Sequence, residues 1–166
     1  MEKIKNTVER IGIKYGLLTF VALVAYFLLM QAVGLGHIIE LRFLNFIILA
    51  YGIYYAIMKL KSEASEDEFY FKGLAEGVVT SMVGVIPFAA FVGFYLAYID
   101  PNLMNEIRQN VPISGYINTF SAFVVVNLEG FASGVLITYV VMQYFSSVEH
   151  KETKRPYVKE KSHIET

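Results

Sequence analysis

Four long apolar stretches constrain the fold of this chain more than any other feature. The 166 residues are 55% hydrophobic, and each stretch is long enough to cross the hydrocarbon core of a bilayer, which takes about 20 helical residues. We expect the spans at about residues 15–35, 43–60, 69–98 and 116–145. The sequence therefore predicts an all-α membrane protein, with four transmembrane helices in an antiparallel up-down bundle.

Three segments outside the spans have patterns of their own. Residues 1–14 are an amphipathic lead, which either lies on the membrane surface or forms the solvated start of the first helix. Residues 100–115 open with Asp-Pro, a good N-cap followed by a good first helical residue, and predict a short interfacial helix between the third and fourth spans. Residues 148–166 are charged and poor in apolar residues, so we expect a disordered cytoplasmic tail.

The links on either side of the second span carry polar residues. His37 and Glu40 could share a metal ion, but without a third ligand we interpret them as polar residues at the membrane interface. Ser65 and Glu68 have the spacing of a capping box, which predicts that the third helix begins there. The chain has no cysteine, which removes thiolate zinc sites and iron–sulfur ligation. We expect neither a metal site nor a cofactor.

The positions of Lys and Arg predict the orientation. The N-terminal lead carries four, residues 59–72 carry three and the tail carries five, whereas only Arg42 and Arg108 lie on the other side. Cytoplasmic segments of membrane proteins carry the excess of Lys and Arg, so we expect both termini to be cytoplasmic. The basic residues are mixed with acids, which favours lipid headgroups over nucleic acid as their partner.

The fourth span carries the residues that suit lipid least. Glu129 lies well inside it, and an ionisable group at the middle of a spanning helix costs about 2.5 to 3.5 kcal/mol on insertion scales. Helical geometry places Ser133 on the face of Glu129 and Asn127 on a roughly opposite face. Because neither face suits lipid, we expect the fourth span to be the most surrounded helix, in the bundle or at an oligomer interface.

Two residues of the third span complete the candidate intramembrane polar site. Pro87 removes one helical hydrogen bond, and at about 1.5 Å per residue it lies close to the depth of Glu129. Glu76 lies more than two turns closer to the cytoplasm, so we do not expect the two acids to form a dyad. The candidate site comprises Glu129, Asn127, Ser133, Pro87 and Glu76.

Glycines in the last two spans predict where helices approach closely. Lipid competes equally for apolar contacts, so small residues that let backbones touch favour helix association in a membrane. The expected packing positions are Gly73, Gly77 and Gly84 in the third span, with Gly130 and Gly134 in the fourth.

Two motifs link the chain to a family. The third span is entered through Tyr-Phe-Lys-Gly-Leu-Ala-Glu-Gly at residues 70–77 and left through Ile-Asp-Pro at residues 99–101. With four spans and cytoplasmic ends, the chain resembles a family of small bacterial inner-membrane proteins known only as a domain of unknown function. The resemblance would cover about residues 11–145. It implies a four-span architecture in the bacterial inner membrane and no particular activity.

Three classes of function fit these features. We interpret the chain as a structural or protein-interaction module of the membrane, in which a protonated Glu129 donates a hydrogen bond. The alternative is a small proton-coupled transporter or carrier that uses Glu129. The second alternative is an intramembrane enzyme, although the sequence lacks the common nucleophile, metal and phosphate-loop motifs. The expected partners are the lipid bilayer and a second copy or another membrane protein.

Overall fold

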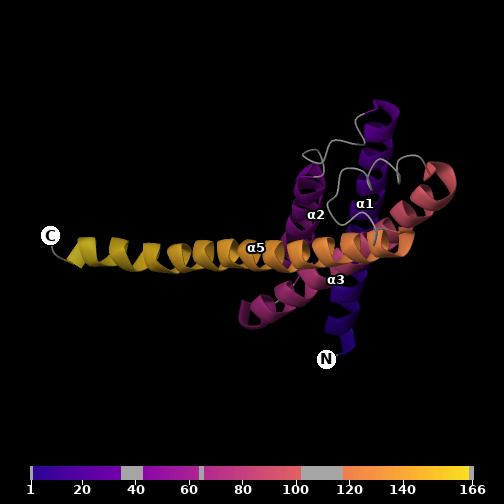
Figure 1. Cartoon of the computed structure of the whole chain (residues 1–166). Coiled ribbons are helices and arrows are strands. Elements are labelled where there is room, and N and C mark those ends of the chain that lie inside the picture. The colour runs from indigo at the N-terminus through magenta and orange to yellow at the C-terminus, as the bar shows by residue number, and fades with distance from the viewer. Residues whose placement is uncertain (1, 35–42, 64–65, 102–117, 165–166) are drawn as a thin grey trace.

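All the regular structure in the described part of the chain is helical (Figure 1). The computed structural model describes residues 2–34, 43–63, 66–101 and 118–164. The elements are α1 (Glu2–Ala32), α2 (Phe43–Lys61), α3 (Glu66–Phe94), the π-helix η2 (Tyr95–Ile99) and α5 (Thr119–Ile164). Four segments are long and apolar enough to cross a membrane, namely Thr7–Ala32, Phe43–Lys61, Phe69–Ile99 and Thr119–Ser147. The predicted all-α fold with four spans is confirmed.

The amphipathic lead and the first span form one helix. α1 runs from Glu2 to Ala32 without a break. Ile11 is buried in a cluster with Ala56 and Leu60 of α2, and Val8 packs against the same cluster. Of the two interpretations of the lead, the start of a longer helix is the one that the structure shows.

Several predictions fall on residues outside the described ranges. They concern His37, Glu40, the capping residue Ser65 and nearly all of the expected interfacial helix over residues 100–115.

α5 itself begins with a reciprocal cap, in which Asn118 Oδ1 accepts from the Ser121 amide and Ser121 Oγ accepts from the Asn118 amide, both at 2.8 Å. Such a cap satisfies backbone donors that have no partner inside the helix.

The C-terminal segment differs from its expected disorder. Residues 148–164 continue α5 as a helix, which extends past the ends of the other helices (Figure 1). Extending an existing helix needs no new nucleus, and Glu and Lys are good helix formers. A composition that cannot form a core can therefore still prolong a helix that begins in the membrane.

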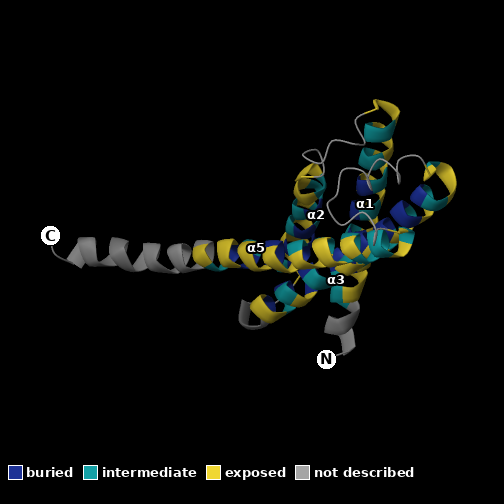
Figure 2. Ribbon diagram, viewed as in Figure 1, coloured by how far each residue is buried: buried dark blue, intermediate teal, exposed yellow. Residues whose placement is uncertain are grey.

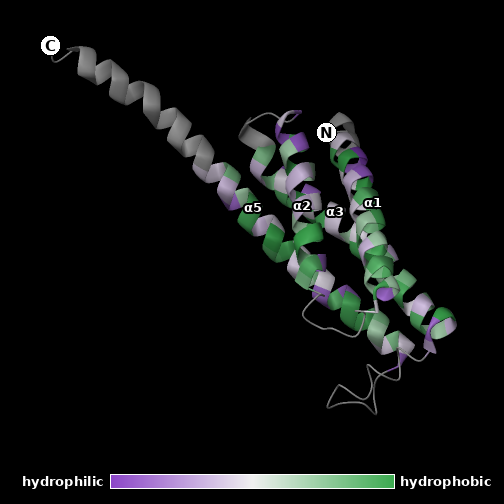
Figure 3. Cartoon of the chain, turned by 90° about the horizontal axis from the view of Figure 1, so that it is seen from above, coloured by the Kyte–Doolittle hydropathy of each residue, from purple (hydrophilic) through white to green (hydrophobic). Residues whose placement is uncertain are grey.

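α3 is the central helix of the bundle. It contacts α1, α2 and α5, whereas α1 and α5 lie on opposite flanks of the bundle (Figure 3). Of the most apolar stretch of α3, 39% is buried within the chain, against 11% of that of α5, and exposed residues run along much of α5 (Figure 2). Within this bundle the most surrounded helix is therefore α3. The expectation that the fourth span would be the most surrounded helix of the bundle is wrong.

The contact between α3 and α5 pairs a glycine with a larger residue at each step. A Cβ atom added at any of these glycines would overlap the side chain opposite. The pairs, in order along α3, are Gly73 with Met142, Gly77 with Thr138, Ser81 with Gly134 and Val85 with Gly130. The two helices are antiparallel, and each missing side chain provides the space that the opposite residue fills.

The contact between α1 and α3 uses the same device. Gly12 lies against Val79, and Gly16 lies against Val83 and the backbone of Thr80. Gly84 lies against α1 as well, where its neighbours are the Gly16 carbonyl and the Thr19 side chain. α3 therefore presents one face with small residues to α5 and another to α1.

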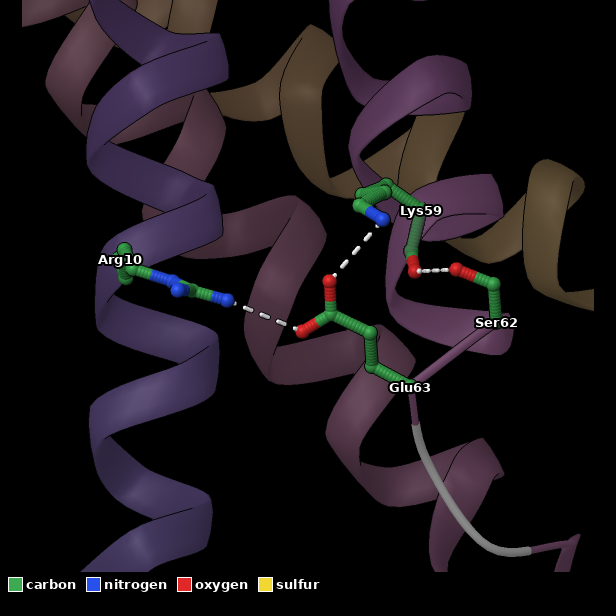
Figure 4. A network of polar contacts seen from close by, with 4 residues as sticks. All are labelled: Arg10, Lys59, Ser62 and Glu63. Carbon is green, nitrogen blue, oxygen red and sulfur yellow. Dashed lines mark hydrogen bonds and ion pairs between the residues drawn. The ribbon is translucent and has the colours of Figure 1, made fainter.

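A group of charged residues joins the ends of α1 and α2 (Figure 4). Glu63 forms ion pairs with Arg10 at 3.2 Å and with Lys59 at 3.0 Å, and Ser62 Oγ donates to the Lys59 carbonyl at 2.7 Å. The hydrogen bond from Lys59, and then the charges of Lys59 and Arg10, lower the pKa of the Glu63 carboxyl below its usual value. This charged group marks one end of the bundle.

The cation of Lys61 extends the same end to α3 and α5. Its Nζ lies 5.7 Å from the centre of the Phe69 ring and 5.4 Å from that of Phe145. Phe145 in turn stacks on Tyr54 of α2, with ring centres 5.6 Å apart. All four long helices therefore contribute residues to this end.

We predict that Gly77→Ala destabilises the bundle, because its new Cβ would overlap Thr138, whose side chain is buried and cannot move aside. Overpacking of this kind costs about 1 to 3 kcal/mol. The matched control is Gly93→Ala in the same helix, α3, where the nearest atoms would lie 3.8 Å from the new Cβ. Thermal unfolding in detergent should show a lower Tm for Gly77→Ala alone; equal melting of both variants would contradict the close approach of α3 and α5.

Candidate functional site

Glu76 of α3 is the buried ionisable residue of this bundle. Its exposed fraction is 0%, and no other charged side chain that the structure describes is buried. The carboxyl group is turned towards α1, where a Cβ atom at Gly12 would lie 3.3 Å from Oε1. A side chain at Gly12 would therefore overlap Val79 and crowd the Glu76 carboxyl group.

The two carboxyl oxygens of Glu76 have different surroundings. Oε1 accepts a hydrogen bond from Thr80 Oγ1, one turn further along α3, at 3.3 Å. Oε2 is buried and has no hydrogen-bond partner among the described residues. A buried polar atom without a partner costs about 1 to 3 kcal/mol. Burial of Glu76 therefore lowers the stability of the fold, and this cost makes the residue a candidate for a functional role.

Four buried hydroxyl groups accompany Glu76 in the bundle, those of Thr19, Thr80, Ser81 and Thr138. Three of them donate to a carbonyl of their own helix: Thr19 to Tyr15 at 2.8 Å, Ser81 to Val78 at 2.9 Å and Thr138 to Gly134 at 2.7 Å. These bonds satisfy the hydroxyl donors within each helix. Only the Thr80 hydroxyl is directed at the carboxyl group.

This arrangement can bind a proton but shows no acidic metal site. In the described residues, no group of three or more His, Asp and Glu side chains comes together. A carboxyl group with one free oxygen in an apolar bundle can take up or release a proton. The buried hydroxyl of Thr80 holds the other oxygen in place.

Glu129 is exposed, whereas Glu76 is buried. Its side chain is exposed on α5, near the middle of the span Thr119–Ser147. The neighbouring Gly130 lies against Val85, so the expected match in depth between Glu129 and this part of α3 agrees with the packing. The carboxyl group itself faces outwards, and the structure does not bring it to Glu76.

The remaining residues of the expected site are half-buried and do not converge. Asn127 Nδ2 donates to the Phe123 carbonyl of its own helix at 2.9 Å. Ser133 is half-buried on α5, and Pro87 is half-buried in α3, which continues as a helix through it. The structure therefore separates the predicted set into a buried acid on α3 and an exposed acid on α5.

Sequence reasoning missed the glycines of α1 that allow its close contact with α3. Gly12 and Gly16 are four residues apart, which is the spacing of the G-x-x-x-G pattern of close helix contacts in membranes. They were not among the predicted packing positions, which all lie in the third and fourth spans. This pattern was the available signal for a close partner of α1.

We predict that Glu76→Met leaves the Tm in detergent unchanged or raises it, because methionine has a similar length and no buried oxygen to satisfy. Thr80→Val should instead lower the stability by about 1 kcal/mol, since it removes the hydroxyl that Oε1 accepts from without changing the shape of the side chain. Thermal unfolding of both variants gives the test. A large loss of stability in Glu76→Met would show that the carboxyl group has a structural role.

The part of the chain before α5 matches the sequence model of a known protein family. A family described as "Protein of unknown function (DUF4199)" matches residues 14–114, which include both motifs around the third span. The match ends before α5 begins at Thr119. Searches of the curated proteins and of the solved structures found no match. Since the matched residues make up more than half of the chain, the protein belongs to this family of proteins of unknown function.

Proposed function

We propose that this protein is an interaction module of the membrane, in which α1, α2 and α3 form a compact support that presents α5 to another membrane protein chain. The observation that carries the proposal is the exposure of α5 together with the acidic residue on its exposed side. Only 11% of the most apolar stretch of this span is buried within the chain.

The exposed side of α5 is not suited to lipid alone. Glu129 is exposed within the span, and an ionisable residue near the middle of a bilayer costs about 2.5 to 3.5 kcal/mol on insertion scales. Contact with another protein surface lowers this cost by replacing hydrocarbon around the carboxyl group. A helix that carries such a residue on its outer side is therefore better suited to an interface than to bulk lipid.

The rest of the bundle supports this role by holding α5 in one position. The four matched glycine contacts with α3 fix both the register and the depth of α5. Buried residues of α2, α3 and α5 also form one apolar cluster, which includes Ile57, Val85 and Met142. The outer face of α5 is thus presented on a rigid element.

A proton-coupled carrier is the second candidate, and Glu76 is the observation that favours it. A buried carboxyl group with one oxygen lacking a hydrogen-bond partner among the described residues resembles the acids that carry protons inside membrane proteins. In this case the titrating residue would be Glu76 and not Glu129, which the sequence had suggested.

The interaction module predicts that α5 has a protein neighbour in native membranes. A photo-crosslinking residue in place of Leu136, which is 64% exposed on α5, should form an adduct of one defined mass with a protein. The matched control is Val21 on α1, which is 59% exposed in the same membrane and should give no such adduct. Equal behaviour of the two positions, on gels of membranes irradiated in intact cells, would contradict the proposal.

We further propose that the protein lies in a bacterial inner membrane with the end around Arg10, Lys59 and Glu63 in the cytoplasm, because segments rich in Lys and Arg stay on that side. The chain has no cysteine, so single cysteines can be labelled without background. Val33→Cys should react with an impermeant thiol reagent in intact cells, and Ser62→Cys should react only after the cells are opened. Labelling of Ser62→Cys from outside would reverse the orientation.

A further inference from the structure

The buried polar side chains of the bundle lie between one end of the spans and their middle. We call the end around Arg10, Lys59 and Glu63 the charged end. The buried polar residues in the described part of the chain are Thr19, Glu76, Thr80, Ser81 and Thr138. Thr19 lies farthest from the charged end, against Gly84, which is midway along the span Phe69–Ile99.

Glu76 lies close to the charged end. Its Oε1 is 3.3 Å from the position that a Cβ atom would take at Gly12. Gly12 follows Arg10 by two residues, which is about 3 Å along α1. The carboxyl group is therefore less than one helical turn of α1 from the level of Arg10, although its exposed fraction is 0%.

Beyond the middle of the spans, apolar side chains close the interior. A cluster of buried residues there comprises Leu23, Phe88, Val92 and Leu96. Phe27 packs against it, with its ring centre 6.4 Å from that of Phe88, 6.0 Å from that of Phe91 and 5.1 Å from that of Tyr95. We call the rings of Phe27, Phe88, Phe91 and Tyr95 the aromatic seal.

The polar groups in the half of the bundle that holds the aromatic seal do not lead to Glu76. Asn45, near the start of α2, and Asn127 of α5 are half-buried amides. The Asn127 amide donates to the Phe123 carbonyl of its own helix. Amide side chains do not titrate, and Tyr95, the member of the seal with a hydroxyl group, lies in η2, nineteen residues beyond Glu76.

The ionisable residues around Glu76 lie towards the charged end, and none of those described forms an ion pair or hydrogen bond with its carboxyl group. Arg10 of α1 and Lys59 of α2 pair with Glu63. The others are exposed or half-buried, namely Glu9, Lys14 and Tyr15 of α1, Tyr54 and Tyr55 of α2 and Lys72 of α3. On α5, the residues opposite this part of α3 are Thr138 and Met142, which do not titrate.

We infer that Glu76 exchanges its proton with the charged end alone, because the aromatic seal closes the site towards the opposite side. Protons move through membrane proteins along ionisable and hydrogen-bonding groups, which the hydrocarbon core of the bilayer does not supply. Oε2 of Glu76 has no hydrogen-bond partner among the described residues, so it has a lone pair available for a proton. Beyond Thr19, the described buried side chains are apolar.

This inference goes beyond the interaction module and does not depend on the partner proposed for α5. It makes Glu76 a site that responds to the pH on one side of the membrane. For a carrier, which needs access from each side in turn, it identifies this conformation as the one that faces the charged end. Movement of the aromatic seal would then be the step that gives access from the opposite side.

Infrared spectroscopy of the full chain in sealed liposomes tests the one-sided exchange. A protonated carboxyl group has a carbonyl band that an ionised one lacks. The band of Glu76 is assigned by its loss in both Glu76→Met and Glu76→Gln, and Glu129→Gln, the control for the exposed acid, should keep it. The orientation of the chain in the liposomes is assigned by the reaction of Ser62→Cys, at the charged end, with an impermeant thiol reagent.

The pH is then raised from acid to alkaline on one side at a time. We expect loss of the Glu76 band when the pH is raised at the charged end, and no change when it is raised on the opposite side. A response to the pH of the opposite side would overturn the seal. A band that follows neither pH, or no band that the Glu76 substitutions remove, would overturn the proton site itself.

Phe27→Ala tests whether the aromatic rings form the seal. The Phe27 ring contacts the other three, so its removal should make the Glu76 band respond to the pH on the opposite side as well. The matched control is Leu28→Ala, which shortens the next residue of α1, 43% exposed, and should keep the parent response. Thermal unfolding confirms that both variants are folded. An unchanged response in folded Phe27→Ala would contradict the assignment of the seal to these rings.

Discussion

The close approach of helix backbones at glycine is the constraint on which the rest of this structure depends. Lipid and protein offer similar apolar contacts, so helices in a membrane gain most where their surfaces fit at short range. Gly77 opposite Thr138 and Gly134 opposite Ser81 give α3 and α5 such a fit in both directions. Gly12 and Gly16 do the same for α1, and α3 becomes the centre because small residues lie on two of its faces.

The same constraint decides the surroundings of the two acids. Glu76 is buried where Gly12 allows α1 to lie close to α3, and Thr80 supplies a hydrogen bond. Glu129 directly precedes Gly130, which faces Val85. Because a helix turns by about 100° per residue, the Glu129 side chain points away from α3 and is exposed. One carboxyl group therefore belongs to the interior of the bundle, and the other belongs to the surface that α5 offers to a partner.

The two acids also explain why one chain suggests two kinds of function. The surroundings of Glu76, with one oxygen held by Thr80, suit proton binding within the chain. The surroundings of Glu129 suit an interface, because the residue is exposed on a helix whose other side is packed closely against α3. An interaction module accounts for the exposed face, whereas a carrier accounts only for the buried acid.

The sequence by itself determined the fold class and the four spans, because the length of an apolar stretch and the thickness of a bilayer are enough to define them. It also indicated Glu129 as an ionisable residue inside the fourth span, and all four glycines of the contact between α3 and α5, since both signals are local. Only the tertiary structure decided that α3 is the central helix and that Glu76, not Glu129, is the buried acid. The side towards which a helical residue points depends on which neighbours pack around the helix, and these contacts join residues far apart in the chain.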